Sequence, residues 1–411
     1  MTDIKKKERE PLVQISKRTD MPKWQAWLIR GGAVIAALVL GAIITAGLTD
    51  ANGFGLFFVD LFNGVFGTPR RILKFFQNTA MMLIIALALA PAFRMRFWNI
   101  GAEGQVLMGG LGCVVCIQYL GGKVSEPLLI FIMFIAAVAF GAAWTVIPAI
   151  FKAQWNTNET LFTLMMNYIA TQLVALCIYV WVPSGSAVLG VLDHGQFPLI
   201  GGQRYVLNII LVAIVMGIMF LYFRFSKHGY ELAVVGESMN TAKYVGINVK
   251  KVIIRTMILS GVLCGFAGFL LVGGTSYTLS TNTVDGRGFT AILVAWLGKF
   301  NPLIMGGTSL LYVFIDQGAS QTATDLSLGG YYADIITGIF FFLVIACEFF
   351  VNYRVRFRFL KGRKKDSSPA APETESAEEG ESSLPVAETE EEEALPVAEA
   401  ATAAANEEVT A

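Results

Sequence analysis

Histidine is almost absent from this sequence, and charged residues of every kind are scarce. Only two of the 411 residues are histidine, and Asp, Glu, Lys and Arg together make up 15%. Both histidines, His194 and His228, fall in loops between apolar stretches, and no paired acids or metal-ligand spacings occur within those stretches. Acid–base and metal-assisted catalysis need such groups close together. The composition therefore argues against a membrane enzyme.

The phosphate-binding loop of ATPases, G-x-x-x-x-G-K-[ST], is also missing. The Gly-Lys pairs, Gly122-Lys123 and Gly298-Lys299, are not followed by Ser or Thr. Without this loop the chain cannot hold the phosphates of ATP by that route. We therefore expect that this chain binds no cofactor of its own, and that a partner subunit using ATP or an ion gradient supplies the energy.

Cysteine is rare, and none of it indicates a disulfide or a metal site. The five cysteines, at positions 113, 116, 177, 264 and 347, all fall in apolar stretches. The C-x-x-C formed by Cys113 and Cys116 is interpreted as a pair of small packing residues. A cleavable signal peptide is not expected either, because the first 27 residues are polar and basic and the first apolar run is long enough to span a membrane.

Long apolar runs are what the sequence has in abundance. Hydrophobic residues make up 55% of the chain, and its mean hydropathy is +0.59. Crossing the hydrocarbon core of a bilayer takes about 20 mostly apolar helical residues. Several windows satisfy this, among them 28–48, 128–151 and 332–351. The sequence predicts an all-α polytopic membrane protein.

The apolar runs predict about ten transmembrane helices, some of them short or broken. They are 28–48, 72–93, 100–120, 127–151, 159–183, 205–224, 252–273, 288–299, 303–318 and 332–351. The eighth and ninth are short and meet at Asn301-Pro302, which favours a helical hairpin or two half-helices there. Residues 51–71 are expected to form an external amphipathic or re-entrant piece.

The two signs of charge are segregated along the chain, and this predicts its orientation. With the N-terminus inside, 25 of the 31 Lys and Arg residues fall in cytoplasmic segments, as the positive-inside rule requires. The external side keeps six: Arg70, Arg71, Lys74, Lys123, Arg204 and Arg287. We expect a multi-pass protein of the plasma membrane with both termini in the cytoplasm.

Four segments follow from these patterns. Residues 1–27 form a basic cytoplasmic N-terminus, 28–351 the transmembrane domain, and 352–365 a basic juxtamembrane segment. Residues 366–411 hold fourteen acidic residues and no Lys or Arg. Their composition predicts a disordered acidic tail, either as a solvating appendage or as a binding site for a basic partner.

Polar residues within the apolar stretches are the first candidates for function, because they are costly in a bilayer. The segment 99–110, "NIGAEGQVLMGG", carries Asn99, Glu103 and Gln105 among several glycines. The glycines make a well-formed helix unexpected at its start and allow neighbouring helices to approach closely. Glu103 is interpreted either as lining a polar pathway or as an interfacial residue that pairs with arginine or satisfies a helix start.

A second polar stripe follows in residues 156–172, "NTNETLFTLMMNYIATQ". Thr160, Thr163, Asn167 and Thr171 recur at three- and four-residue steps, so they share one face of a helix. A helix facing only lipid would not carry this stripe. Interhelical hydrogen bonding and the lining of a polar pathway both explain it.

The largest internal loop, within 225–254, is too polar to insert but regular enough for a short amphipathic helix. Such a helix on the cytoplasmic face is suited to docking a soluble partner. A plain basic connector is the alternative.

Five ordered blocks resemble one known family over about residues 70–350. They are "NIGAEGQ", "NETLFTLMMNYIA", "GYELAVVGESMNTAKYVGIN", "MILSGVLCGFAG" and "GRGFTAILVAWLGKFNPL". Together they are similar to permease subunits of the branched-chain amino acid and simple-sugar ATP-binding-cassette importers, and the first two blocks to nucleoside-type members. The resemblance implies a pore built with a second, usually different permease, two ATP-binding subunits, an external substrate-binding protein and a bacterial inner membrane. Nucleic acid is not expected as a partner.

The resemblance also implies roles for particular residues. In the loop 225–251, the expected transmitters of ATPase motion are Glu231, Gly236, Glu237, Ala242 and Gly246. The expected substrate pathway residues, chosen because they are polar residues within apolar stretches, are Asn99, Glu103, Gln105 and Asn167. The loop departs from the family pattern at Ala233-Val234 and Ser238-Met239, so we expect either that its docking on the ATP-binding subunit differs in detail or that the two halves of the transporter are asymmetric.

The predicted function is import of a small polar solute, most readily nucleosides, by a subunit that is not itself an enzyme. Sugars or branched-chain amino acids are the alternatives within the family. An ion-coupled secondary transporter is the alternative outside it, with Glu103, Asp316 or Asp334 as the coupled carboxylate.

Overall fold

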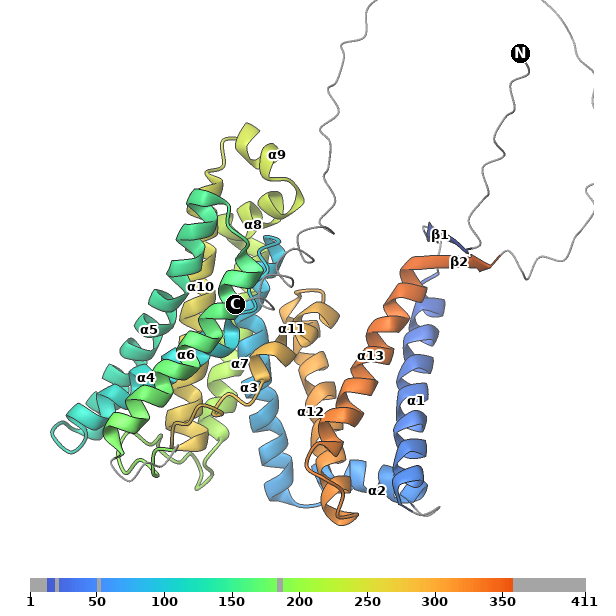
Figure 1. Cartoon of the computed structure of the whole chain (residues 1–411), viewed down its shortest axis with the longest axis horizontal. Coiled ribbons are helices and arrows are strands. Elements are labelled where there is room, and N and C mark those ends of the chain that lie inside the picture. The colour runs from blue at the N-terminus through green and yellow to red at the C-terminus, as the bar shows by residue number, and fades with distance from the viewer. Residues whose placement is uncertain (1–12, 19–21, 50–52, 183–187, 358–411) are drawn as a thin grey trace, which may run out of the picture. The chain divides into compact units, whose positions relative to one another are not determined.

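The computed structural model describes residues 13–18, 22–49, 53–182 and 188–357, and these are mostly helical (Figure 1). The helices are α1 (Lys23–Leu48), α2 (Gly53–Phe66), α3 (Pro69–Arg94), α4 (Ala102–Leu120), α5 (Glu126–Trp155), α6 (Glu159–Trp181), α7 (Val206–Phe225), α8 (Lys227–Glu237), α9 (Met239–Tyr244), α10 (Val249–Leu271), α11 (Arg287–Leu297), α12 (Pro302–Asp325) and α13 (Tyr332–Asn352). A π-helical turn, η1 (Val272–Ser276), extends α10. The predicted acidic tail, 366–411, lies outside the described residues.

Eight helices in the described part of the chain are long and apolar enough to cross a membrane. They are α1, α3, α4, α5, α6, α7, α10 and α13. Each overlaps one of the predicted spans, so the all-helical membrane architecture is confirmed at this level.

The predicted helical hairpin is present, but its two arms are unequal. Helix α11 has 11 residues, about 16 Å of helix, which is roughly half of the hydrocarbon thickness. Helix α12 has 24 residues, so the prediction of a short helix ending at 318 is wrong. The C-terminal half of α12 is polar, so the hydropathy pattern did not indicate that the helix continues to Asp325.

The turn between these arms is fixed by local chemistry. Lys299 and Phe300 both have positive φ (49° and 55°), which reverses the chain tightly. Asn301 then caps α12 by accepting a hydrogen bond from the backbone N–H of Leu303 at 3.1 Å. Pro302 occupies the first turn of α12, where its missing N–H costs nothing.

Helix α2 accounts for the predicted piece at 51–71. It has 14 residues, too few to cross, and lies across the ends of α1 and α12 (Figure 1). A Cβ at Gly318 of α12 would lie 2.9 Å from Leu61 of α2, so glycine permits the close crossing.

Both ends of the described chain meet on one side. Strands β1 (Val13–Lys17) and β2 (Tyr353–Phe357) form a two-stranded sheet, an element that the hydropathy pattern does not predict. Helices α8 and α9 lie at the same end of the helices (Figure 1). The two-stranded sheet and the 225–254 segment therefore lie at one end of the helices, and the side of the membrane that each terminus occupies stays a prediction.

The centre of the fold is a tight packing of α4, α5 and α10 through small residues. A Cβ at Gly109 of α4 would lie 2.6 Å from the Cα of Gly265 of α10, and one at Gly112 would lie 3.0 Å from the carbonyl oxygen of Ala136 of α5. Helix α4 is continuous from Ala102, so the expectation of a poorly formed helix start is wrong. The glycines of α4 allow this close helix packing. The irregular backbone lies before the helix, in residues 95–101.

Candidate functional site

The irregular backbone lies in residues 95–101, between the end of α3 and the start of α4. Asn99 organises it. Its Oδ1 accepts hydrogen bonds from the backbone N–H of Gly101 and from Nε2 of Gln105, both at 3.0 Å. Its Nδ2 donates to Oε1 of Gln105 at 3.2 Å and to Oγ of Ser260 in α10 at 3.3 Å. The two amides therefore pair reciprocally.

Helix α6 supplies the remaining partners for this backbone. Asn167 donates from Nδ2 to the carbonyl oxygen of Ile100 at 2.8 Å and accepts from the N–H of Gly104 at 2.9 Å. Thr163 Oγ1 accepts from the N–H of Ile100 at 3.1 Å. Unpaired backbone groups are costly at membrane depth, and these side chains satisfy them.

Three of the four predicted pathway residues are thus brought together. Asn99, Gln105 and Asn167 are buried, with 0%, 1% and 5% of their surfaces exposed. Their polar groups hold α4, α6 and α10 around the non-helical segment. This is the interhelical hydrogen bonding expected as one of the two explanations for the polar stripe. A pathway role for these residues stays a prediction.

Glu103, the fourth, lies in the first turn of α4, and its carboxylate contacts the start of α11. Its carboxylate accepts from the N–H of Gly286 at 2.9 Å and of Gly288 at 2.7 Å. These are unpaired donors at the start of α11, where a negative charge is favoured by the helix dipole. A Cβ at Gly288 would overlap the backbone of Glu103. Glu103 therefore satisfies a helix start, as one interpretation expected, but the helix is α11 rather than its own.

Further charges lie around the same helix start. Arg287 interacts electrostatically with Glu103 and with Asp316 of α12, and Asp334 of α13 also acts on Asp316. The charge pattern of the sequence placed Arg287 among the external basic residues. Its position directly before the predicted short helix at 288–299 was the available signal that it lies at a helix start.

The predicted docking loop forms two short helices rather than one. Ser226 caps α8 through the N–H of Gly229 at 2.8 Å, and Ser238 caps α9 through the N–H of Thr241 at 3.2 Å. Gly246, with φ of +83°, follows the end of α9. Each boundary therefore has a local chemical cause.

One face of α8 and α9 packs against the membrane helices, and the opposite face is exposed. Leu232, Val235 and Ala242 are buried against the end of α3 and against α5 and α10. A Cβ at Gly236 would overlap the carbonyl oxygen of Arg94, the last residue of α3. Glu231 is half-buried and Glu237 exposed.

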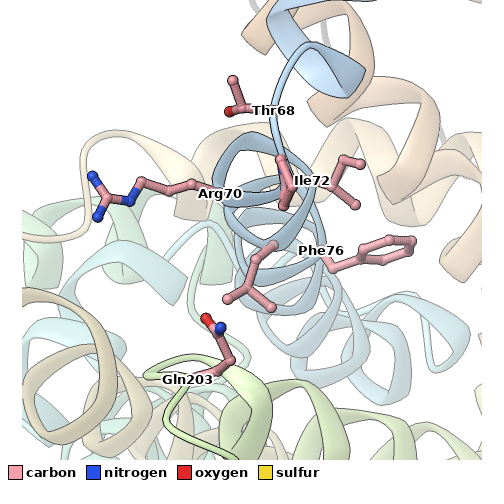
Figure 2. Close-up of a pocket in the computed structure, with 7 residues that line it drawn as sticks. Thr68, Arg70, Ile72, Phe76 and Gln203 are labelled. Carbon is pink, nitrogen blue, oxygen red and sulfur yellow. The ribbon is translucent and has the colours of Figure 1, made fainter.

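A groove of about 470 Å³ separates α8 from the α11–α12 turn. Its lining residues are Phe93, Arg94, Arg96, Trp98, Ala233, Gly236, Glu237, Trp296, Lys299 and Phe300. A second pocket, of about 570 Å³, lies at the opposite end of α3. Figure 2 shows Arg70 and Phe76 of α3 with Gln203 from the loop before α7.

Residues 71–345 match a protein family described as the permease component of branched-chain amino acid transport systems. The match covers more than half of the chain. The protein belongs to this family. It is therefore the permease of an ABC importer, a multi-pass transport subunit and not an enzyme. Such a permease works with ATPase subunits and a binding protein.

Curated relatives cover most of the permease. The guanosine ABC transporter permease protein NupP of Bacillus subtilis is 29% identical over 348 residues, 82% of this chain and 96% of the relative. A glucose ABC transporter permease protein of Haloferax volcanii is 26% identical over 380 residues, 87% of this chain and 97% of the relative. A second guanosine permease of Bacillus subtilis, NupQ, is 24% identical over 247 residues, 57% of this chain and 77% of the relative.

Proposed function

We propose that this permease imports nucleosides across a bacterial plasma membrane. The observation that carries the proposal is the similarity to the guanosine permease of Bacillus subtilis over 96% of that relative's length. A nucleoside ABC transporter permease protein of Lactococcus lactis, 26% identical over 310 residues, adds support. Both termini lie in the cytoplasm in this proposal.

The permease pairs with a second, different permease and with two ATP-binding subunits. Two distinct guanosine permeases of one organism resemble this chain, which supports a heterodimeric pore. The partner ATPases bind and hydrolyse ATP, and an external binding protein selects and delivers the solute. This chain holds no cofactor in the proposal.

The solute passes the face of the permease where α4 meets α11. Glu103 is partly exposed there and interacts with Asp285 and Arg287, and Arg287 also interacts with Asp316. Carboxylates and guanidinium groups hydrogen-bond well to hydroxyl and amide groups of a polar solute. Asn99, Gln105 and Asn167 contribute by holding Glu103 and the non-helical segment in position behind this face.

Helices α8 and α9 dock on the ATPase. Buried Gly236 and Ala242 fix them to the membrane domain, and Glu231, Glu237 and Gly246 shape the outer face. Tyr244 and Val245 are 92% and 63% exposed. Apolar side chains that remain exposed on a cytoplasmic helix are suited to burial by a partner protein.

The test is reconstitution of the permease in proteoliposomes with its cognate ATPase, second permease and binding protein. Uptake of labelled guanosine should require ATP and should be competed by unlabelled nucleosides, not by glucose. Uptake that a proton or sodium gradient drives without ATP would contradict the proposal.

Glucose or a related sugar is the second candidate, favoured by the Haloferax volcanii relative and its coverage of 97%. In the same assay, competition by hexoses and not by nucleosides would assign the permease to sugars. Ribose and glucose both present neighbouring hydroxyls, so the charged groups at the face where α4 meets α11 are suited to either solute.

A further inference from the structure

Helix α11 is held at both of its ends. At its N-terminus the Glu103 carboxylate accepts two backbone hydrogen bonds, from Gly286 and Gly288. At its C-terminus Trp296 lies against Trp98, with ring centroids 5.6 Å apart. About 12 Å of helix axis separates Gly288 from Trp296. The helix is therefore a short rod with one contact at each end.

The contact at the C-terminal end is a cluster of four aromatic rings. Phe300 stacks on Phe93 with centroids 5.8 Å apart and planes at 10°. Phe93 meets Trp98 edge to face at 5.7 Å, and Trp98 meets Trp296. Two of these rings come from the end of α3 and the segment after it, and two from the end of α11 and its turn. The cluster therefore joins two segments about 200 residues apart in the chain.

Helix α8 contacts the chain directly beside this cluster. Gly236 of α8 contacts the carbonyl oxygen of Arg94, the residue after Phe93. Ala233 and Gly236 also line the groove whose other wall includes Trp98 and Trp296. A displacement of α8 therefore meets the end of α3 first and the aromatic cluster next.

The two routes from the cluster converge on one residue. From Trp98 the chain runs through Asn99 to Glu103, and from Trp296 α11 runs back to Gly288, which contacts Glu103. The α11–α12 turn is stiff, because a Cβ at Gly298 would overlap Met305 and two successive residues have positive φ. The segment 98–103 and α11 therefore form a loop that is closed by the contact of Trp98 with Trp296 and by the contact of Glu103 with Gly288.

We propose that α11 transmits movement of α8 to Glu103, with Trp98 and Trp296 as the positioning residues that couple the two. This rests on the proposed docking of α8 and α9 on the ATPase. Trp98 and Trp296 are 43% and 50% exposed, as tryptophans of a membrane-interface belt also are. Their contacts with each other and with buried Phe93 distinguish them from such a belt.

The first experiment compares Trp98→Ala and Trp296→Ala in the reconstituted importer. ATP hydrolysis should stay within about twofold of wild type, while solute uptake per ATP falls at least tenfold. Trp98→Phe should restore most of the uptake, since a ring remains. The matched control is Trp155→Ala at the end of α5, because Trp155 is 62% exposed and packs on Phe151 outside the loop.

Two results would overturn the proposal. One is wild-type uptake per ATP in both alanine variants, and another is an equal loss in the Trp155 control. If an alanine variant fails to assemble, Trp98→Leu keeps most of the apolar volume and provides the same measurement.

The second experiment uses a background in which the five native cysteines are replaced. Trp98→Cys with Trp296→Cys should lose uptake per ATP, and a short bifunctional thiol reagent that joins positions 98 and 296 should restore it. Absence of recovery after complete cross-linking would contradict the proposed coupling through positions 98 and 296.

The docking role is tested separately with Tyr244→Asp on α9. Reduced co-purification of the ATPase is expected. Wild-type co-purification and ATP-dependent uptake would contradict the docking role alone, whatever the tryptophan variants show.

Discussion

Glu103 of α4 caps α11 through the backbone N–H of Gly288, with a donor–acceptor distance of 2.7 Å. The carboxylate is thereby shared between two helices whose sequences lie 185 residues apart. Any rearrangement that separates α4 from α11 exposes both the charge and the helix start. Glu103 is accordingly the side chain whose replacement should be most informative.

Glu103→Ala should lower uptake at least tenfold while expression and ATPase assembly stay normal. The variant leaves two backbone donors at a helix start unpaired, and hydrogen bonds to a charged group contribute about 1.5–3 kcal/mol each. Glu103→Gln keeps acceptor oxygen without charge and should be intermediate. The loss of transport is measured by uptake and ATP hydrolysis, and the loss of stability by thermal unfolding in detergent. Full uptake by Glu103→Ala would leave Glu103 with no pathway role.

Gly236→Ala should weaken the packing of α8 against the end of α3. The added Cβ meets the Arg94 carbonyl oxygen, and overpacking of this kind costs about 1–3 kcal/mol. A lower melting temperature and reduced co-purification of the ATPase are expected. Gly217→Ala in α7 is the control, since nothing lies within 4 Å of a Cβ there. Equal behaviour of the two variants would refute the close contact.

Asn167→Ala should destabilise the permease by leaving the Ile100 carbonyl and the Gly104 N–H unpaired. Each buried unsatisfied group costs about 1–3 kcal/mol. Thermal unfolding and hydrogen exchange at Gly104 report the change, and Thr171→Ala on the same helix face is the milder control. Unchanged stability with abolished uptake would instead assign Asn167 to the pathway.

His228 should make the stability of the permease fall at mildly acidic pH. It is 4% exposed, with the Tyr222 hydroxyl against Nδ1 and Thr256 Oγ1 3.3 Å from Nε2. Burial lowers the pKa of His228 below 6.5, nearby Arg255 lowers the pKa further, and Glu231 opposes this. The unfolded chain therefore binds the proton more readily, and stability decreases as pH falls through 6.5 toward the folded pKa.

The measurement for His228 is thermal unfolding at pH 7.5 and pH 5.5. His228→Gln should show a smaller difference between the two conditions than the wild type. An identical difference would show that His228 does not contribute to the pH dependence.

Deletion of 366–411 should leave uptake within about twofold of wild type, because a segment of this composition cannot bury a core. The deleted chain should insert at normal yield. Loss of uptake despite normal insertion would point to a partner of the acidic tail.

The spans could be predicted because hydropathy is a local property of each segment. The half-helix could be predicted because Asn301 and Pro302 act on their immediate neighbours. Helix α12 was predicted too short, since the polar residues after Gln317 broke the apolar run without breaking the helix. The signal in such a stretch is helical periodicity and not hydropathy.

The site was only partly predictable. The polar residues of 99–105 and of 156–172 stood out separately, but the bonds between Asn167 and the 100–104 backbone join residues more than 60 apart. No local pattern contains that pairing. Arg287 was missed for a different reason, because counting charges by loop assigns a residue to a side of the membrane and does not identify its neighbours in space.

The ion pair between Arg30 of α1 and Glu348 of α13 has a consequence for synthesis. The two side chains meet at 2.6 Å but lie 318 residues apart. At 5–20 residues per second the ribosome needs about 15–60 s to progress from one to the other. Helix α1 thus enters the bilayer long before α13 exists, so the ion pair that joins the first described span to the last forms only at the end of synthesis.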